Sequence, residues 1–109
     1  MVYDEGLAER IAGIFSVKQE FEVKKMFGGL CYMSKGHMVV GIVGDELMVR
    51  VGKENWESAL TRPHAREMDF TGKPMKGMIY VAKPGFESGK DLESWIDLAL
   101  SFTNSLEPK

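Results

Sequence analysis

The single cysteine of the chain, Cys31, is the first residue whose chemistry could serve catalysis. A thiolate nucleophile needs a histidine or a helix N-terminus nearby to lower the pKa of the thiol. The sequence offers His37 and His64, but it does not place either of them beside Cys31. A cysteine between Leu30 and Tyr32 is more often a small core residue. We therefore expect Cys31 to be structural, and an enzyme centred on Cys31 stays an alternative.

Metal binding has less support in the sequence. Protein sites for transition metals gather several histidine or cysteine ligands at characteristic spacings. Two histidines 27 positions apart and one cysteine match no such spacing. We expect neither a metal nor another cofactor.

A group of basic residues in the second half of the chain is the best candidate for a binding site. Arginine forks and ammonium groups that converge from one irregular loop could hold a phosphate or a carboxylate. Glu67 and Asp69 lie in the same stretch, so salt bridges on a solvated surface explain the charges equally well. The candidate binding residues are Arg50, Arg62, His64, Arg66, Lys73 and Lys76.

Gly28 and Gly29 raise the possibility of a phosphate-binding loop, because glycines allow close approach of the backbone. A dinucleotide fingerprint consists of a strand, the glycines and then a helix. Here a predicted strand continues after the glycines, and no lysine–serine pair follows. We interpret the pair as a bulge or as a close helix–sheet contact where a side chain would not fit.

The length and composition are those of a soluble globular protein. The 109 residues predict a single domain over 1–109, and one cysteine fits a reducing, cytoplasmic compartment. No run approaches the roughly 18 apolar residues of a membrane-spanning helix. The N-terminus also lacks the features of a signal peptide, so we expect no membrane association.

Charge is unevenly distributed along the chain. Residues 24–83 carry ten bases and six acids, whereas the segments before and after them are each net acidic. The pI of about 5.7 and the acidic flanks argue against the broad basic surface of a nucleic-acid-binding protein. Nucleic acid is therefore not favoured as a partner.

Periodicity of apolar residues predicts the elements that must position these side chains. Spacing of three and four residues predicts helices over 7–15, 53–61 and 92–102, and the second should end before Pro63. Alternation with a period of two predicts strands joined by turns too short for parallel neighbours. The stretch 62–76 is expected to be mostly irregular. The predicted strands cover residues 24–33, 37–43, 46–51, 68–70 and 78–82.

This order, α-β-β-β-α-(β)-β-α, predicts an α+β fold in which helices cover one face of an antiparallel sheet. Seven of the eight methionines lie in its strand-rich centre. Most should fill gaps beneath the helices, since methionine adapts to irregular space. Alternation must point others to the opposite face. If helices leave that face open, Met48 or Met78 beside Tyr80 would form an exposed apolar binding surface.

Three stretches carry a family resemblance: KMFGG at 25–29, ELMVRV at 46–51 and REMDFTGKPMKG at 66–77. At this spacing they resemble the TfoX/Sxy N-terminal domain family, and the likeness covers most of the chain. The resemblance implies a two-layer, secretion-chaperone-like fold of order α-β3-α-β2-α, and it brings no established catalytic residue. The motif residues expected to be structural are Met26, Phe27, Gly28, Gly29, Asp69, Phe70, Thr71 and Gly72.

The best-known members of that family regulate natural competence, and a helical C-terminal domain follows this domain in them. Only three residues follow Leu106, so we expect that second domain to be missing. The resemblance and the lack of an assembled catalytic group predict a non-enzymatic regulatory or adaptor domain. Its expected partner is a protein, including a second copy in a homodimer. A module that binds small anions or nucleotides and an enzyme centred on Cys31 are the alternatives.

Overall fold

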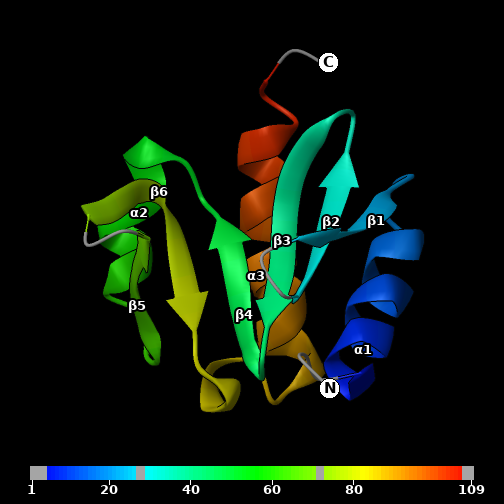
Figure 1. Cartoon of the computed structure of the whole chain (residues 1–109), viewed down its shortest axis with the longest axis horizontal. Coiled ribbons are helices and arrows are strands. Elements are labelled where there is room, and N and C mark those ends of the chain that lie inside the picture. Colours follow the sequence, from blue (N-terminus) through cyan, green and yellow to red (C-terminus); the bar gives the residue numbers. More distant parts are fainter. Residues whose placement is uncertain (1–4, 27–28, 71–72, 107–109) are drawn as a thin grey trace.

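One antiparallel sheet contains all six strands that the described residues form (Figure 1). The structure, a computed structural model, describes residues 5–26, 29–70 and 73–106. The order of strands across the sheet is β1-β2-β3-β4-β6-β5. The elements are α1 (Glu5–Ser16), β1 (Glu22–Met26), β2 (Gly29–Ser34), β3 (His37–Val43), β4 (Glu46–Arg50), α2 (Lys53–Leu60), β5 (Ala65–Phe70), β6 (Lys73–Val81), the short 3-10 helix η1 (Lys83–Gly85) and α3 (Gly89–Thr103).

The α+β class and the antiparallel meander β2–β3–β4 are confirmed. The expected single strand over 24–33 is wrong, because Met26 and Gly29 are antiparallel partners and the chain reverses between them. The implied order α-β3-α-β2-α therefore has one strand too few before α2. The expectation that 62–76 is mostly irregular is also wrong. Within it, β5 begins at Ala65 and β6 at Lys73, and the two strands pair.

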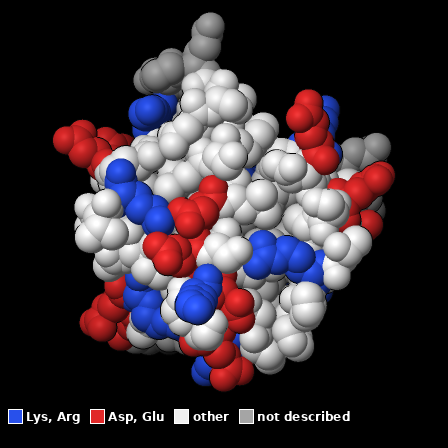
Figure 2. Space-filling model, turned by 180° about the vertical axis from the view of Figure 1, so that it is seen from behind, with Lys and Arg blue, Asp and Glu red and all other residues white. Residues whose placement is uncertain are grey.

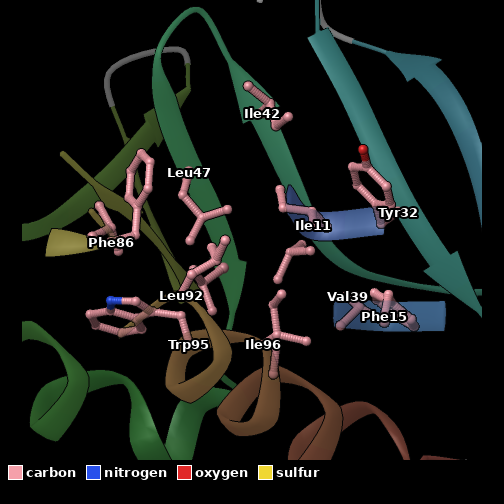
Figure 3. Close-up of a cluster of buried hydrophobic side chains, with 14 of the residues drawn as sticks. Ile11, Phe15, Tyr32, Val39, Ile42, Leu47, Phe86, Leu92, Trp95 and Ile96 are labelled. Carbon is pink, nitrogen blue, oxygen red and sulfur yellow. The ribbon is translucent and has the colours of Figure 1, made fainter. Parts of the chain in front are cut away.

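The helices α1, α2 and α3 of the described residues pack on one face of the sheet, where the larger hydrophobic core lies. Alternate residues of β4, Leu47 and Val49, point into this core. In α3, Trp95 and Ile96 pack against them, and α2 contributes Ala59. Figure 1 shows α3 behind β3 and β4, and Figure 3 shows the apolar side chains between these layers.

Capping and long-range hydrogen bonds fix the helices over this core. The Ser88 hydroxyl accepts the Asp91 N–H at 3.0 Å, which satisfies one of the free donors at the start of α3. The Tyr32 hydroxyl donates to the Ala8 carbonyl at 2.9 Å and joins β2 to α1. The Arg10 guanidinium donates to the Phe86 carbonyl at 2.8 Å, so α1 is also tied to the segment that leads into α3.

None of the helices in the described part of the chain has the length and apolarity that a membrane crossing needs.

The alternate residues of the same strands form a second, smaller cluster on the opposite face. Cys31, Met48 and Met78 are its buried members. Met48 is 0% exposed and Met78 is 9% exposed, so the expectation that they form an exposed surface is wrong. Neighbouring side chains of this face pack against both. The half-buried residues packed against this cluster are Met33, Met38, Val43 and Tyr80.

Gly29 is required by a close approach of two backbones. A Cβ built on Gly29 would overlap the carbonyl oxygen of Ile42 in β3. The interpretation of this glycine as a site where no side chain fits is therefore correct, but the neighbour is a strand rather than a helix. Gly28 lies outside the described residues.

Replacing Gly29 with alanine should lower the free energy of unfolding by about 1–3 kcal/mol, the usual cost of overpacking, because β2 and β3 must separate. The matched control is Gly13→Ala in α1, where a Cβ meets nothing within 4 Å. There alanine should stabilise the helix by about 0.5–1 kcal/mol. Urea unfolding followed by circular dichroism measures both changes. Equal stability of the Gly29→Ala variant and the parent would contradict the strand contact.

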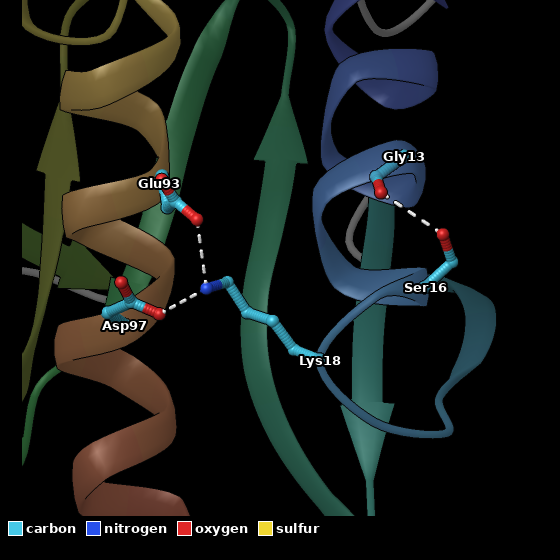
Figure 4. A network of polar contacts seen from close by, with 5 residues as sticks. All are labelled: Gly13, Ser16, Lys18, Glu93 and Asp97. Atoms are coloured by element: carbon cyan, nitrogen blue, oxygen red, sulfur yellow. Dashed lines mark hydrogen bonds and ion pairs between the residues drawn. The ribbon is translucent and has the colours of Figure 1, made fainter.

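An ion-pair network joins the segment after α1 to the outer face of α3 (Figure 4). The Lys18 ammonium lies 2.7 Å from Asp97 Oδ1 and 3.1 Å from Glu93 Oε2. Hydrogen bonds from Asp97 and then Glu93 raise the pKa of Lys18, because both carboxylates favour its charged form. The Lys18 side chain is 20% exposed, but those of Glu93 and Asp97 are 50% and 54% exposed, so solvent screens much of the attraction.

The Lys18→Met variant should lose up to about 1 kcal/mol of stability at pH 7. A raised pKa in the folded state means that this contribution is complete below the pKa of the unfolded lysine, about 10.4. It is lost as the pH rises through the higher pKa of the folded state. Thermal melts at pH 7 and above pH 10.5, with exposed Lys53→Met as the control, measure this change. A difference between parent and Lys18→Met that is independent of pH and salt would argue against the network.

Candidate functional site

Arg62, the first of the predicted binding residues, stacks on an aromatic ring of the helix layer. It follows the end of α2, and its Cζ lies 3.7 Å from the centroid of the Trp95 ring. Its Nη2 also donates to the Ser94 hydroxyl at 3.1 Å. The Trp95 indole N–H donates to the Gly85 carbonyl at 3.1 Å, which fixes the ring beneath the guanidinium. This arginine therefore joins the end of α2 to α3.

Arg66 lies on the opposite face of the sheet from Arg62. It pairs with Tyr80 across β5 and β6, and its Cζ lies 4.6 Å from the centroid of the Tyr80 ring. Its guanidinium also forms an ion pair with Glu46 of β4. Burial raises the pKa of the Tyr80 phenol, and the positive charge of Arg66 opposes part of that rise. Arg66 thus covers one side of the second cluster.

The remaining basic candidates lie at the end of β4, between α2 and β5, and in β6. Arg50, at the end of β4, has its Cζ 5.5 Å from the centroid of the Phe102 ring in α3. His64 is exposed between α2 and β5, has a φ of 68° and accepts the Ala82 N–H at its carbonyl. Lys73 and Lys76 are strand residues of β6, and their side chains lie outside the described part of the structure.

The structure does not bring the guanidinium groups of Arg50, Arg62 and Arg66 together, because each stacks on a different aromatic ring. The face of the molecule shown in Figure 2, opposite to the one seen in Figure 1, carries acidic and basic side chains side by side rather than a patch of one charge. These three residues form three separate structural contacts.

The family-motif residues lie where paired strands meet their turns. Met26 pairs with Gly29 at the end of the β1–β2 hairpin. In the stretch 66–77, Asp69 pairs with Pro74, and Phe70 pairs with Lys73 at the end of the β5–β6 hairpin. Phe27, Gly28, Thr71 and Gly72 fall outside the described residues.

Cys31 is buried in the second cluster at 0% exposure. Burial raises the pKa of its thiol, whereas a thiolate nucleophile needs a lowered pKa. His37 pairs with Ser34, which alternation places on the face opposite Cys31. His64 lies before β5 and outside the second cluster. Neither imidazole is arranged to activate this thiol.

Gly41 lies between two buried members of the second cluster, and its role there was not predicted from the sequence. Gly41 is the cross-strand partner of Cys31 on one side and of Met48 on the other. A Cβ built on Gly41 would lie 2.5 Å from Met48 Cε and 3.5 Å from Met38 Cε. The missing side chain thus leaves space that two methionine termini fill. Strand alternation places Cys31 and Met48 on one face once strand pairing is known.

A surface hollow lies between the end of α1, the start of β1 and the β2–β3 turn. Phe21, Met33 and Lys35 are among its lining residues. Two of its polar lining residues hydrogen-bond to each other, because the Gln19 amide donates to the Ser34 hydroxyl at 2.6 Å.

Throughout the described ranges, no group of three or more His, Cys, Asp and Glu side chains could hold a metal ion.

These observations define a two-layer α+β domain whose sheet carries an apolar cluster on each face and helices on one. A family model, the TfoX N-terminal domain, matches residues 14–103. The chain therefore belongs to the TfoX N-terminal domain family. No curated protein matches the sequence.

The Arg62→Met variant tests whether this arginine acts in the fold. Loss of the stacked cation should cost about 0.5–2 kcal/mol of unfolding free energy, since the ring contact is partly desolvated. The control is Lys83→Met, which removes an exposed positive charge and should change stability by less than about 0.5 kcal/mol. Chemical denaturation of both variants measures the difference. Equal stability of Arg62→Met and Lys83→Met would contradict the structural role.

Proposed function

We propose that this protein is a non-enzymatic regulatory or adaptor domain that binds a protein partner through the second face of its sheet. The observation that carries the proposal is the second apolar cluster. It draws none of its described members from a helix, although all three helices cover the other face. Membership of the TfoX N-terminal domain family, which is best known for competence regulators, supports a regulatory role.

The half-buried side chains of this face suit protein recognition. Met33, Met38, Val43 and Tyr80 lie over the buried members of the cluster and remain partly accessible. Methionine side chains are flexible and polarisable, so they can adapt their shape to a partner. Interfaces are enriched in methionine, tyrosine and arginine, and the Arg66–Tyr80 stack borders the surface.

The alternatives have less support from the geometry. An anion site would need several free cations at one place, but Arg50, Arg62 and Arg66 each stack on a separate ring. An enzyme centred on Cys31 would need an accessible, activated thiol, and Cys31 is buried with a raised pKa. The single cysteine, which forms no disulfide, favours a cytoplasmic location.

The test compares proteins captured from an extract of the native cells by the parent chain and by Met33→Glu. A charge on this face should reduce capture of the partner at least about fivefold, because a central interface residue contributes about 1 kcal/mol or more. The control is Val17→Glu, which changes a residue that is 83% exposed and lies outside both clusters. Circular dichroism verifies that both variants are folded.

A mass measurement of the purified parent and Met33→Glu proteins in solution determines whether the partner is a second copy. In that case the parent is a dimer and Met33→Glu is a monomer. Equal capture by the parent and Met33→Glu would refute the proposed surface. A monomeric parent that enriches no protein would refute the adaptor function.

A further inference from the structure

The strand β1 forms one edge of the sheet. Among the described residues it pairs only with β2, in an unbroken register from Glu22 to Met26. Residues 22–25 are all exposed to solvent. An edge strand presents a row of unpaired N–H and C=O groups to which another strand can add. The backbone of β1 is therefore open to a strand from another molecule.

The opposite edge of the sheet, β5, is less suited to such pairing. Its register with β6 shifts between Glu67 and Asp69, and Arg66 is held by its contacts with Tyr80 and Glu46. Irregularities of this kind bend an edge strand and protect it from further pairing. The register of β1 contains no such shift. Of the two edges, β1 is thus the one that can accept a strand.

Two charges at this edge have no ion-pair partner in the described part of the chain. Strand alternation places Glu22 and Lys24 on the second face of the sheet, where they pair with Met33 and Cys31 of β2. The ion pairs between described residues do not include either charge. An acid and a base therefore lie two positions apart along the edge, each available to a partner.

The residue between these charges is apolar and open. Val23 pairs with Tyr32 on the helix-covered face, but it is 46% exposed and belongs to neither cluster. Branched side chains such as valine stabilise a sheet by packing against cross-strand neighbours. Val23 has such a neighbour in β2, and its other side faces the free edge.

We infer that β1 pairs with β1 of a second copy of the chain, antiparallel and about a two-fold axis at Val23. In this register Val23 lies opposite the partner's Val23. Each Glu22 lies opposite the partner's Lys24, and the symmetry produces this pair twice. Opposite charges at facing positions stabilise an antiparallel pair. The edge is thus complementary to itself, as a two-fold interface requires.

Charge also disfavours the neighbouring registers. Facing side chains of an antiparallel pair share one face of the sheet, so a symmetric pair must be centred on a residue. Centring it on Glu22, Lys24 or Lys25 would bring two like charges together, which destabilises the pair. Val23 is the one uncharged residue among 22–25. The charges that discourage unspecific pairing at this edge therefore permit the register centred on Val23.

The paired sheet goes beyond the proposed function, because it uses the edge of the sheet rather than its second face. The two-fold axis runs normal to the sheet, so the second faces of both copies lie on the same side. A dimer of this kind presents two partner-binding surfaces side by side.

The test is sedimentation equilibrium of the purified full chain at low ionic strength, where the parent should form a dimer. Glu22→Lys and Lys24→Glu should each raise the dissociation constant at least about tenfold, because both facing pairs then carry like charges. An equimolar mixture of the two variants should dimerise as the parent does, since each facing pair is again one acid and one base. Circular dichroism verifies that the variants are folded.

Two valines provide a matched control. Val23→Lys places like charges at the two-fold axis and should also weaken the dimer at least about tenfold. Val17→Lys adds the same charge at a residue that is 83% exposed and lies outside β1, so it should dimerise as the parent does.

Three results would overturn the edge pairing. The first is a parent that stays monomeric at its highest soluble concentration. The second is a mixture of Glu22→Lys and Lys24→Glu that dimerises no better than either variant alone. The third is a dimer that Met33→Glu dissociates and Lys24→Glu does not, since the contact would then lie on the second face. Partner capture is measured separately, so either proposal can fail while the other stands.

Discussion

The sheet is apolar on both faces, yet the α-helices that the structure describes all pack on one of them. Strand alternation sends Leu47 and Val49 under the helices and Met48 to the other face. Apolar side chains on the uncovered face must therefore bury one another. Long, unbranched methionines can do this because they are flexible, and the methyl carbons of Met48 and Met38 extend over Gly41, which has no side chain. The position of the second cluster, its partial exposure and its sulfur content all follow from this constraint.

The same constraint explains the placement of the arginines. A row of paired residues crosses the sheet from Cys31 through Gly41 and Met48 to Tyr80, and Arg66 stacks on the ring that ends the apolar row. Its guanidinium covers the ring while it stays hydrated and paired with an acidic neighbour. Basic residues that looked like an anion site in the sequence therefore border apolar surfaces instead.

The fold class, the three helices and the central meander could be predicted because each has a local signal in its periodicity. The β1–β2 hairpin could not, because alternation is the same in one long strand and in two paired ones. In the edge strand β5, Arg66 and Glu67 are consecutive charged residues, so the apolar alternation indicated only the end of the strand, at 68–70. The basic candidates could be selected from the sequence by residue type, but their contacts could not. Arg62 stacks on Trp95 of α3, a partner far away in the sequence.

Nuclear magnetic resonance of methionine methyl groups tests most directly whether the second face is closed by its own side chains. The chain is labelled with ¹³C at methionine Cε, and a soluble paramagnetic agent is added. We expect the Met48 methyl signal to be protected, the Met38 signal to be partly broadened, and a cross-peak to link the two above Gly41. Strong broadening of the Met48 signal without that cross-peak would contradict a closed face.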